Sequence, residues 1–382
     1  MRVLILVAAM VAGLVACNNH RGRESPYSAT LTFSLDTVYV DPGDEILFLR
    51  DNLFVSDLSP DKRYLINFNR SELVAERIDL DALKLEKKIQ FEKEGPERMP
   101  VYFSGFRINS EEQFLVWSNQ SYGIYDQNAK KVKDLELEKI AADLLGGGET
   151  LPMGLFEDPD QPGRLLAVIM QWKEEDYFVL DVDLSTRSFQ KIALPELAPL
   201  KDYSMEILYD GQFMGSFGVG VYPVAGKDKI ILANNSINES LVFDTNTGGI
   251  RVVRWNTPLL GERRGYLPPA QVEETSGAKE EIIKRSREDI FYGRLIWDDS
   301  HERFFRFSIK EQFGQEKNEY GQYTPMGAEV CLSIFDENLD LLAESLVPEL
   351  KAPPKKHFVK DGKIWIFENI ADEMAFIRLN VE

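Results

Sequence analysis

Apolar and polar residues alternate in short runs along most of this chain, and many of the runs end in the same way. An apolar residue is followed by Asp, a polar turn and a further alternating run at Ile78-Asp79, Tyr125-Asp126, Val182-Asp183, Phe243-Asp244 and Phe335-Asp336, with a weaker copy at Leu379-Asn380. Alternation with a period of two predicts half-buried strands. A unit that recurs every ~40–60 residues is typical of a β-propeller or a solenoid.

Each repeat divides into four predicted strands, which we name a to d in chain order. The five predicted a strands are Ile46–Val55, Val101–Ile108, Gly154–Glu157, Gly215–Val224 and Phe291–Trp297. A sixth unit near the end of the sequence has only three predicted strands, and Ala29–Val40 is an unassigned strand at the other end. We therefore predict an all-β, six-bladed β-propeller closed by the N-terminal strand, as one domain over residues 29–382, because closure removes exposed sheet edges.

The recurring Asp residues stand at the start of the predicted c–d turns. An Asp side chain in this position accepts hydrogen bonds from backbone N–H groups two residues further on. The pairs Asp79/Asp81 and Asp181/Asp183 lack the Gly and the distant Glu of a calcium-binding loop. We therefore expect turns here, and neither catalysis nor a metal.

The longest connections all join strand b to c or strand d to the next strand a. They are Glu138–Met153, Pro195–Met214, Asn256–Ile290, Lys310–Ala328 and Val347–His357. In a four-stranded meander these two kinds of connection lie at the same end of the blade, so we predict that one face carries the functional site. Gly215–Gly220 is expected to be a glycine-rich inner strand near the channel, and Val272–Arg287 a short helix over it.

Aromatic and Arg side chains are the candidate binding residues of this long-loop face. They are Arg70, Trp117, Trp172, Arg263, Arg264 and Tyr266, with Tyr323 nearby. Trp and Tyr stack on sugars or anchor protein partners, and an Arg pair can receive a carboxylate or sulfate. The alternative is that each Trp packs between blades and that Arg263-Arg264 is a solvated loop.

The N-terminus has the pattern of an export signal. Arg2 precedes an apolar run from Val3 to Ala16, which is too short for a transmembrane helix, and Cys17 follows small residues. Leu14-Val15-Ala16-Cys17 resembles a bacterial lipobox. We therefore expect a signal peptide over residues 1–16, a lipidated Cys17 and a polar tether over residues 17–28, which would anchor the protein to a bacterial membrane with its domain facing the periplasm or the cell surface. The sequence leaves open which membrane holds the anchor.

The net charge of the chain disfavours some classes of binding partner, and its cysteine content indicates a buried thiol. The formal net charge of −19 disfavours nucleic acids and anionic lipid surfaces, so membrane contact is expected through the acyl chains alone. Cys331 stands in an alternating strand and is predicted to be a buried thiol. We expect a monomer with no cofactor.

Enzymatic chemistry has few candidate residues. The three histidines, His20, His301 and His357, form no metal-ligand or triad pattern, and no Gly-x-Ser-x-Gly is present. A glycosidase would need two carboxylates close together at the channel mouth. The candidates are Glu94, Glu157, Asp158, Glu174, Glu175 and Glu368.

Several of these features together resemble a known family. The lipobox, the Asp-terminated c strands, Ser59-Pro60-Asp61-Lys62-Arg63-Tyr64-Leu65 and Glu94-Gly95-Pro96 are similar to those of uncharacterised TolB-like six-bladed propeller lipoproteins of Bacteroidota-type envelopes. The resemblance implies a fold and an envelope location, but no reaction. We therefore expect a lipid-anchored protein that binds a glycan, peptide or protein partner at its long-loop face, with a carbohydrate-active enzyme as the alternative.

Overall fold

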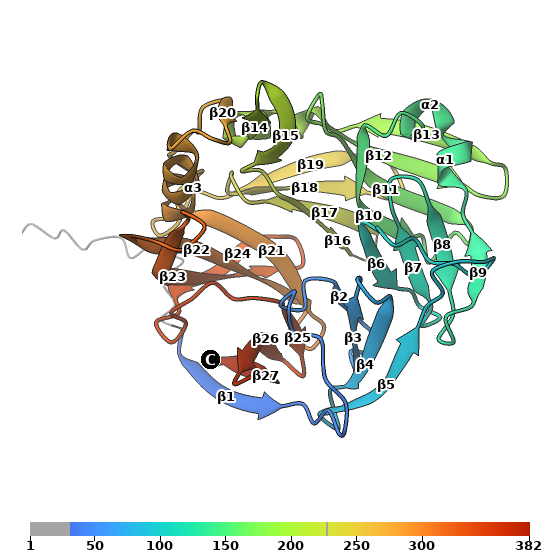
Figure 1. The fold of residues 1–382 in the computed structure, drawn as a ribbon, viewed down its shortest axis with the longest axis horizontal. Helices are drawn as coiled ribbons and strands as arrows, with labels where there is room; N and C mark the ends of the chain where they lie inside the picture. The colour runs from blue at the N-terminus through green and yellow to red at the C-terminus, as the bar shows by residue number, and fades with distance from the viewer. Residues whose placement is uncertain (1–30, 227) are drawn as a thin grey trace, which may run out of the picture.

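The computed structural model describes residues 31–226 and 228–382. Within these residues the chain forms six four-stranded sheets and one three-stranded sheet, so the protein is all-β (Figure 1). The six larger sheets follow one another in chain order around the molecule, and their strands are antiparallel meanders. The predicted signal peptide, Cys17 and the tether lie outside the described residues.

The strands of the six larger sheets are given from the innermost strand outward. The first two sheets are β2 (Ser56–Leu58), β3 (Tyr64–Asn69), β4 (Val74–Asp79), β5 (Lys84–Gln90) and β6 (Gly105–Ile108), β7 (Phe114–Trp117), β8 (Tyr122–Tyr125), β9 (Lys131–Asp134). The next two are β10 (Thr150–Glu157), β11 (Arg164–Gln171), β12 (Asp176–Asp183), β13 (Ser188–Ala193) and β16 (Val221–Ala225), β17 (Lys229–Asn234), β18 (Glu239–Asp244), β19 (Ile250–Arg254). The last two are β21 (Phe291–Asp298), β22 (Arg303–Lys317), β23 (Tyr323–Asp336), β24 (Leu341–Leu346) and β25 (His357–Lys360), β26 (Lys363–Ile370), β27 (Glu373–Val381), β1 (Phe33–Tyr39).

The N-terminal strand completes the last sheet. β1 pairs antiparallel with β27, from Phe33 opposite Val381 to Tyr39 opposite Ala375. This is the pairing that the sequence predicts for the unassigned strand at residues 29–40. The last sheet then meets the first, because Phe358 and Trp365 pack in one apolar cluster with residues of the first sheet.

The recurring Asp residues make the predicted turns. Asp79, Asp126, Asp183, Asp244 and Asp336 each accept two backbone N–H bonds on Oδ1, at distances from 2.8 to 3.1 Å. One donor is always the residue two positions further on. The structural interpretation of these residues is therefore confirmed.

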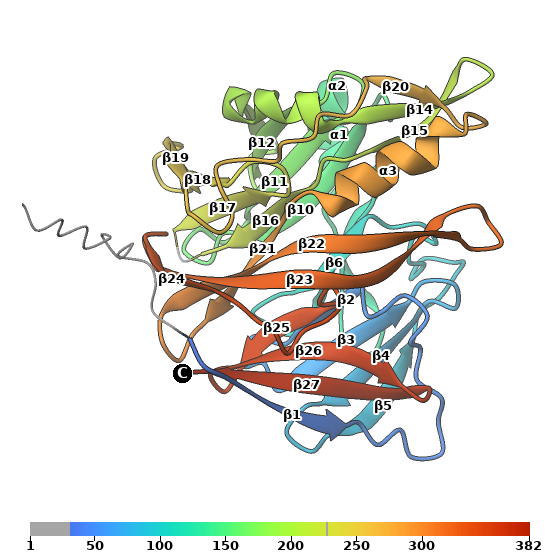
Figure 2. The same ribbon diagram turned by 90° about the vertical axis from the view of Figure 1, so that its left-hand side faces the viewer.

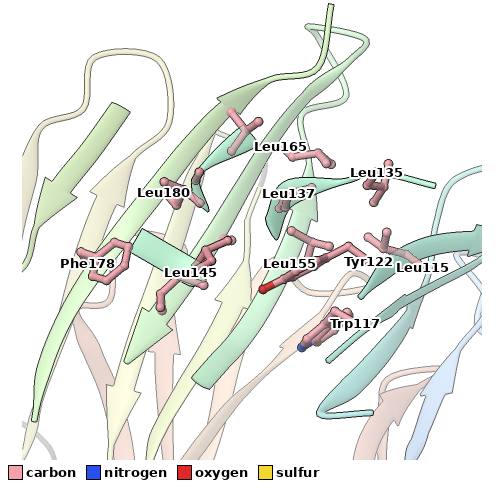
Figure 3. Packing of buried hydrophobic residues seen from close by; sticks show 14 of the residues in the cluster. Leu115, Trp117, Tyr122, Leu135, Leu137, Leu145, Leu155, Leu165, Phe178 and Leu180 are labelled. Carbon is pink, nitrogen blue, oxygen red and sulfur yellow. The ribbon is translucent and has the colours of Figure 1, made fainter. Parts of the chain in front are cut away.

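Two of the long connections fill the wedges between sheets. α1 (Leu137–Ile140) and α2 (Ala142–Leu145) place Leu137 and Leu145 among apolar residues of the second and third sheets (Figure 3). The 3₁₀ helix η1 (Pro195–Tyr203) does the same between the third and fourth sheets through Leu197 and Leu200. Radially arranged sheets diverge outward, so extra side chains are needed there to keep the interior close-packed.

Three predicted elements differ most from the structure, and the predicted strand Val101–Ile108 begins only at Gly105. Ile46–Val55 contains no strand; the first inner strand is Ser56–Leu58. The predicted strand Gly215–Val224 is interrupted, because Gly218 adopts a φ of +123° and a side chain there would meet the Tyr203 carbonyl oxygen at 2.0 Å. Most of Lys310–Ala328, predicted as a loop, is the paired extension of β22 and β23.

The remaining insertions gather on one side of the molecule. β14 (Met205–Tyr209), β15 (Gln212–Phe217) and β20 (Gln271–Glu273) form the three-stranded sheet, and α3 (Ala278–Glu288) lies next to it and to β22 (Figure 2). The prediction of a short helix within Val272–Arg287 is confirmed in part, since α3 begins at Ala278 and ends one residue beyond Arg287. Among the helices described, none combines the length and apolar character required to cross a bilayer.

Candidate functional site

A cavity of about 380 Å³ opens beside α3, on the side of the molecule that carries the insertions. Its walls come from the link between β15 and β16, the last turn of α3, the start of β21 and the middle of β22. The lining residues include Phe217, Tyr222, Asn235, Arg264, Ser286, Arg287, Phe291, Ile309, Glu311 and Pro353. A pocket of this size, with mainly apolar walls and a few polar groups, is typical of a ligand site.

The cavity depends on the glycine-rich link. A Cβ on Gly220 would lie 2.5 Å from the Tyr222 hydroxyl, so only glycine leaves this ring room beside the backbone. The Asn235 side chain binds both ends of the link: its Nδ2 donates to the Gly218 carbonyl at 2.7 Å, and its Oδ1 accepts from the Gly220 N–H at 3.0 Å. The link is therefore a fixed wall of the cavity.

Arg264 is the unusual residue of this cavity. It is 4% exposed and carries a charge, yet its Nε has no hydrogen-bond partner among the residues that the structure describes. Its Nη2 donates to the Ser286 carbonyl oxygen, and burial lowers the pKa of the guanidinium. Unsatisfied buried donors are rare because each costs free energy.

Ser286 is the second unsatisfied group. It lies on α3, is 3% exposed, and its hydroxyl has no hydrogen-bond partner. Arg264 and Ser286 both line the cavity. Neighbouring atoms cover the Arg264 Nε and the Ser286 hydroxyl, so a carboxylate or another oxyanion would reach these two donors only after a local shift of the cavity wall.

The only carboxylate among the residues lining the cavity is already paired. Arg287 donates through Nε and Nη2 to the two oxygens of Glu311, at 2.5 and 2.6 Å. A bidentate pair of this kind leaves Glu311 unavailable as a free base. The cavity therefore lacks the two carboxylates that glycoside hydrolysis needs.

Exposed apolar side chains also occur on the long-loop face. They belong to connections that join strand d to the next strand a, or strand b to c, and they include Ile46, Phe54, Tyr102, Tyr209, Phe213, Met214, Leu267, Tyr320 and Met326. Tyr102 is 89% exposed and Ile46 86%. Exposed apolar residues concentrated on one face indicate an interaction surface.

The sequence-predicted site residues divide between this face and the interior. Trp117 was expected at the surface but is 4% exposed, and its Nε1 donates to the Pro152 carbonyl at 3.2 Å between two sheets. Arg264 is also buried, which corrects its expected exposure. Arg70 and Arg263 are exposed, and Arg70 lies 4.0 Å from Asp51.

The remaining candidates lie among the insertions. Trp172 stacks on Phe213 of β15 with ring centroids 5.2 Å apart. The Arg285 guanidinium lies 4.6 Å from the centre of the Tyr266 ring, and Tyr323 has Lys284 and Lys317 at 4.5 Å from its ring centre. Of the predicted residues, only Arg264 lines the cavity. Sequence reasoning missed Ser286, which no local pattern distinguishes from other surface serines.

The family model described as "Domain of unknown function (DUF4221)" matches residues 25–346. The chain belongs to this family. It is similar to the crystal structure of a DUF4221 member from Bacteroides vulgatus, with 14% identity and a TM-score of 0.68 over 92% of this chain and 98% of that chain.

A second similar structure is that of a Bacteroides fragilis protein named as a candidate exported protein. It has 10% identity and a TM-score of 0.51 over 92% of this chain and 95% of that chain. The Dos1 propeller is similar at 8% identity and a TM-score of 0.40 over 84% of this chain and 76% of that chain, which is too distant to carry an argument. No curated protein matches the sequence. At these low sequence identities, the similar structures inform only the fold of this DUF4221 protein, and not its function.

The described part of this DUF4221 protein contains no group of three His, Cys, Asp or Glu residues arranged to hold a metal ion. His301 is exposed, and its Nδ1 lies 2.8 Å from Asp298. Cys331 is 3% exposed, as predicted, and burial raises the pKa of its thiol.

The carboxylates considered for catalysis have structural partners or face solvent. Asp158 accepts from Arg164 at 2.8 Å in the β10–β11 turn, and Glu175 accepts from the Ser204 hydroxyl at 2.5 Å. Glu368 is paired with Lys355. Glu94, Glu157 and Glu174 are exposed.

Proposed function

We propose that this protein is a lipid-anchored binding protein of the bacterial cell envelope. Its long-loop face would hold a polypeptide partner, and a carboxylate of that partner would enter the cavity beside α3. The observation that carries the proposal is that Arg264 and Ser286 both line the cavity and that each retains a buried polar atom without a hydrogen-bond partner among the described residues. A carboxylate would satisfy both groups and offset the cost of burying the charge.

The exposed side chains favour a polypeptide over a glycan. Sugar-binding faces rely on flat aromatic rings, whereas this face also offers the aliphatic and thioether side chains of Ile46, Met214 and Met326. Such side chains pack well against apolar groups of a peptide or protein, and Met adapts to irregular surfaces. The carboxylate would give the buried Arg264 guanidinium an anionic partner, although the chain as a whole is acidic.

The same proposal includes the finer points of architecture and location. We propose a six-bladed propeller closed by the N-terminal strand and related to TolB-like lipoproteins; the six four-stranded sheets and the β1–β27 pairing support this. Lipidation of Cys17 is supported by the Leu14-Val15-Ala16-Cys17 sequence. An anchor before the domain would hold the binding face at the membrane without any basic surface patch.

Selection from a random peptide library with free C-termini tests the proposal. The full-length protein should enrich peptides that combine a carboxylate with apolar residues. The affinity of a selected peptide should fall at least about tenfold in Phe213→Ser and in Tyr320→Ser, since apolar anchors dominate such interfaces. Both side chains are exposed, so neither change should disturb folding.

Phe189→Ser is the matched control, because Phe189 is exposed on β13, away from the long-loop face. It should leave the affinity unchanged. Arg264→Gln should remove the preference for a carboxylate while amidated peptides bind as before. A selection that enriches nothing, or a glycan array that shows binding where peptides do not, would contradict the proposed partner.

A further inference from the structure

A second group of cations lies among the innermost strands. Arg107 is on β6, Arg294 on β21, and Lys356 immediately precedes β25. These strands belong to the second, fifth and sixth sheets and face the middle of the molecule (Figure 1). Contacts between these elements bring the three cations together: Lys356 Nζ donates to the Ser56 carbonyl of β2 at 2.7 Å, β2 contacts β6, and β21 contacts β25. In agreement with this arrangement, Arg294 and Arg107 lower the pKa of Lys356, after burial itself.

A break in the β-ladder directs Arg294 inward. The register of β21 against β22 shifts between Tyr292 and Leu295, so that Gly293 and Arg294 have no direct partners. A bulge of this kind turns a side chain out of the regular alternation. Gly293 is needed there because a Cβ would lie 2.4 Å from the Phe307 carbonyl oxygen.

The guanidinium groups have no polar partners in the protein. Among residues 31–226 and 228–382, neither Arg107 nor Arg294 donates a hydrogen bond or forms a salt bridge. Each contacts an aromatic ring instead: Arg107 lies 4.5 Å from the centre of Phe156, and Arg294 5.6 Å from that of Tyr222. Their N–H groups, five on each side chain, are therefore free for a ligand.

Arg294 is both solvent-accessible and desolvated. Its side chain is exposed, yet the surrounding strands lower its pKa by burial. The two observations agree if the guanidinium points into a water-filled space enclosed by the inner strands. Arg107 is half-buried, and burial lowers its pKa too.

The charge of the cluster is only partly compensated. Asp57 on β2 is the carboxylate that acts on all three cations, and its Oδ2 accepts from the Ile108 backbone N–H at 2.9 Å. Lys356 uses one of its donors on the Ser56 carbonyl, at 2.7 Å. The neighbouring His357 presents a buried Nε2 without a partner. Three cations and one carboxylate leave an excess of two positive charges.

We propose that Arg107, Arg294 and Lys356 form a binding site for a small tetrahedral oxyanion, a phosphate or a phosphomonoester. Two guanidinium groups without polar partners among the described residues and one ammonium come from three different sheets, and together they supply donors for the several oxygens of a phosphate group. The excess of two positive charges matches a phosphate dianion. This site goes beyond the proposed binding of a polypeptide. Tyr222 lines the outer cavity, and its ring centre lies 5.6 Å from the Arg294 guanidinium.

Calorimetric titration of the full-length protein with inorganic phosphate at about pH 7 tests the site. One phosphate should bind with a Kd below about 1 mM. Arg294→Gln and Arg107→Gln should each weaken binding at least about tenfold, because each removes a charged fork. A parallel titration with glycerol phosphate shows whether the free anion or a phosphomonoester binds more tightly.

Arg70→Gln is the matched control, since Arg70 is an exposed Arg outside the cluster, and it should bind phosphate as the unmodified protein does. Phe213→Ser should also leave phosphate binding unchanged, which separates this proposal from the one above. Thermal melting gives a second readout: without phosphate, Arg294→Gln should melt above the unmodified protein, since it removes repulsion, and phosphate should raise its Tm less.

If Arg107→Gln fails to fold, the phosphate affinities of Arg294→Gln and Lys356→Gln test the proposal instead. The proposal is overturned if phosphate does not bind, or if the Arg294→Gln and Lys356→Gln variants bind it as tightly as the Arg70→Gln control.

Discussion

At the scale of single residues, one side chain accounts for the repeat in the sequence. The Asp that ends each c strand binds backbone N–H groups of the following turn, and the same hydrogen bonds stabilise its charge. Hydrogen bonds from Ser185 and Thr186 lower the pKa of Asp183 to about 2, and those of Thr247 and Asn246 lower the pKa of Asp244. At Asp183 and Asp244 the depressed pKa therefore accompanies a turn, and not a proton donor.

Asp79 gives the clearest test of that role, because it is 4% exposed. Its Oδ1 accepts from Asp81 and Ala82, both at 2.9 Å, and its Oδ2 accepts from Arg63. Asp79→Ala should lower the free energy of unfolding by about 2 kcal/mol, since it leaves two backbone donors without their acceptor. Asp79→Asn keeps an acceptor oxygen and should lose distinctly less. Urea denaturation measures both, and equal losses would contradict the turn role.

At the scale of elements, the short helices α1 and α2 act as packing inserts. Leu145 of α2 is 1% exposed among side chains of two sheets (Figure 3). Leu145→Ala should therefore lower the free energy of unfolding by about 3 kcal/mol, through lost burial and the cavity it leaves. Leu151→Ala is the matched control, because Leu151 is 37% exposed on β10. It should change stability by less than about 0.5 kcal/mol. Equal losses of unfolding free energy for the two variants in chemical denaturation would contradict the role of α2 in packing between the two sheets.

The sequence predicts the regular strands well because they have a local signal. Alternation located the inner strands β10 and β21, and the recurring Asp residues located the turns that they begin. The errors occur where long-range contacts decide the conformation. Residues 46–55 alternate like a strand, but the Phe48 N–H is bound by the Glu76 carboxylate at 3.0 Å, so this segment leaves the ladder.

The candidate sites could be predicted only in part. The sequence identified the long-loop face and Arg264, because chain length and an unusual basic pair are local features. It could not identify the cation cluster, since Arg107, Arg294 and Lys356 are far apart in the chain and meet only when three sheets converge. A charged residue inside a predicted inner strand was the one available signal, and it is weak without the fold.

At the scale of the whole molecule, the β1–β27 pairing joins the two ends of the described chain. Deleting residues 1–40 should remove this pairing, expose the edge of β27 and abolish cooperative unfolding. Deleting residues 1–28 is the control, because it retains all of β1, and this shorter deletion should melt like the full chain. Thermal melting and size-exclusion chromatography measure both variants. If the longer deletion stays monomeric and melts at the same temperature, the β1–β27 pairing contributes nothing to stability.

Because the inner strands bring charged side chains close together, they also shift the pKa values of these groups. Lys356 is faced by charged or titratable groups from several elements: Asp57, Arg107, Arg294, His357 and, beside Arg294, Tyr222. Burial lowers the pKa of Lys356 from 10.5 to about 8 and that of His357 to about 4, while burial raises that of Tyr222 to about 12. Lys356 is therefore the member of this cluster that changes charge near neutral pH.

The lowered pKa of Lys356 has two consequences: raising the pH should stabilise the free protein, and it should weaken the binding of phosphate. Between about pH 8 and 10.5, Lys356 holds fewer protons in the folded chain than in the unfolded chain, so its contribution to the free energy of unfolding rises with pH. Below about pH 8 the amine is charged in both states, and the full cost of burying that charge then lowers the stability. Phosphate needs the charged amine, so its Kd should rise about tenfold from about pH 7 to about pH 9. Lys356→Arg stays charged over this range and should show a distinctly smaller rise in calorimetric titrations. An equal rise in both proteins would mean that Lys356 does not contact the anion.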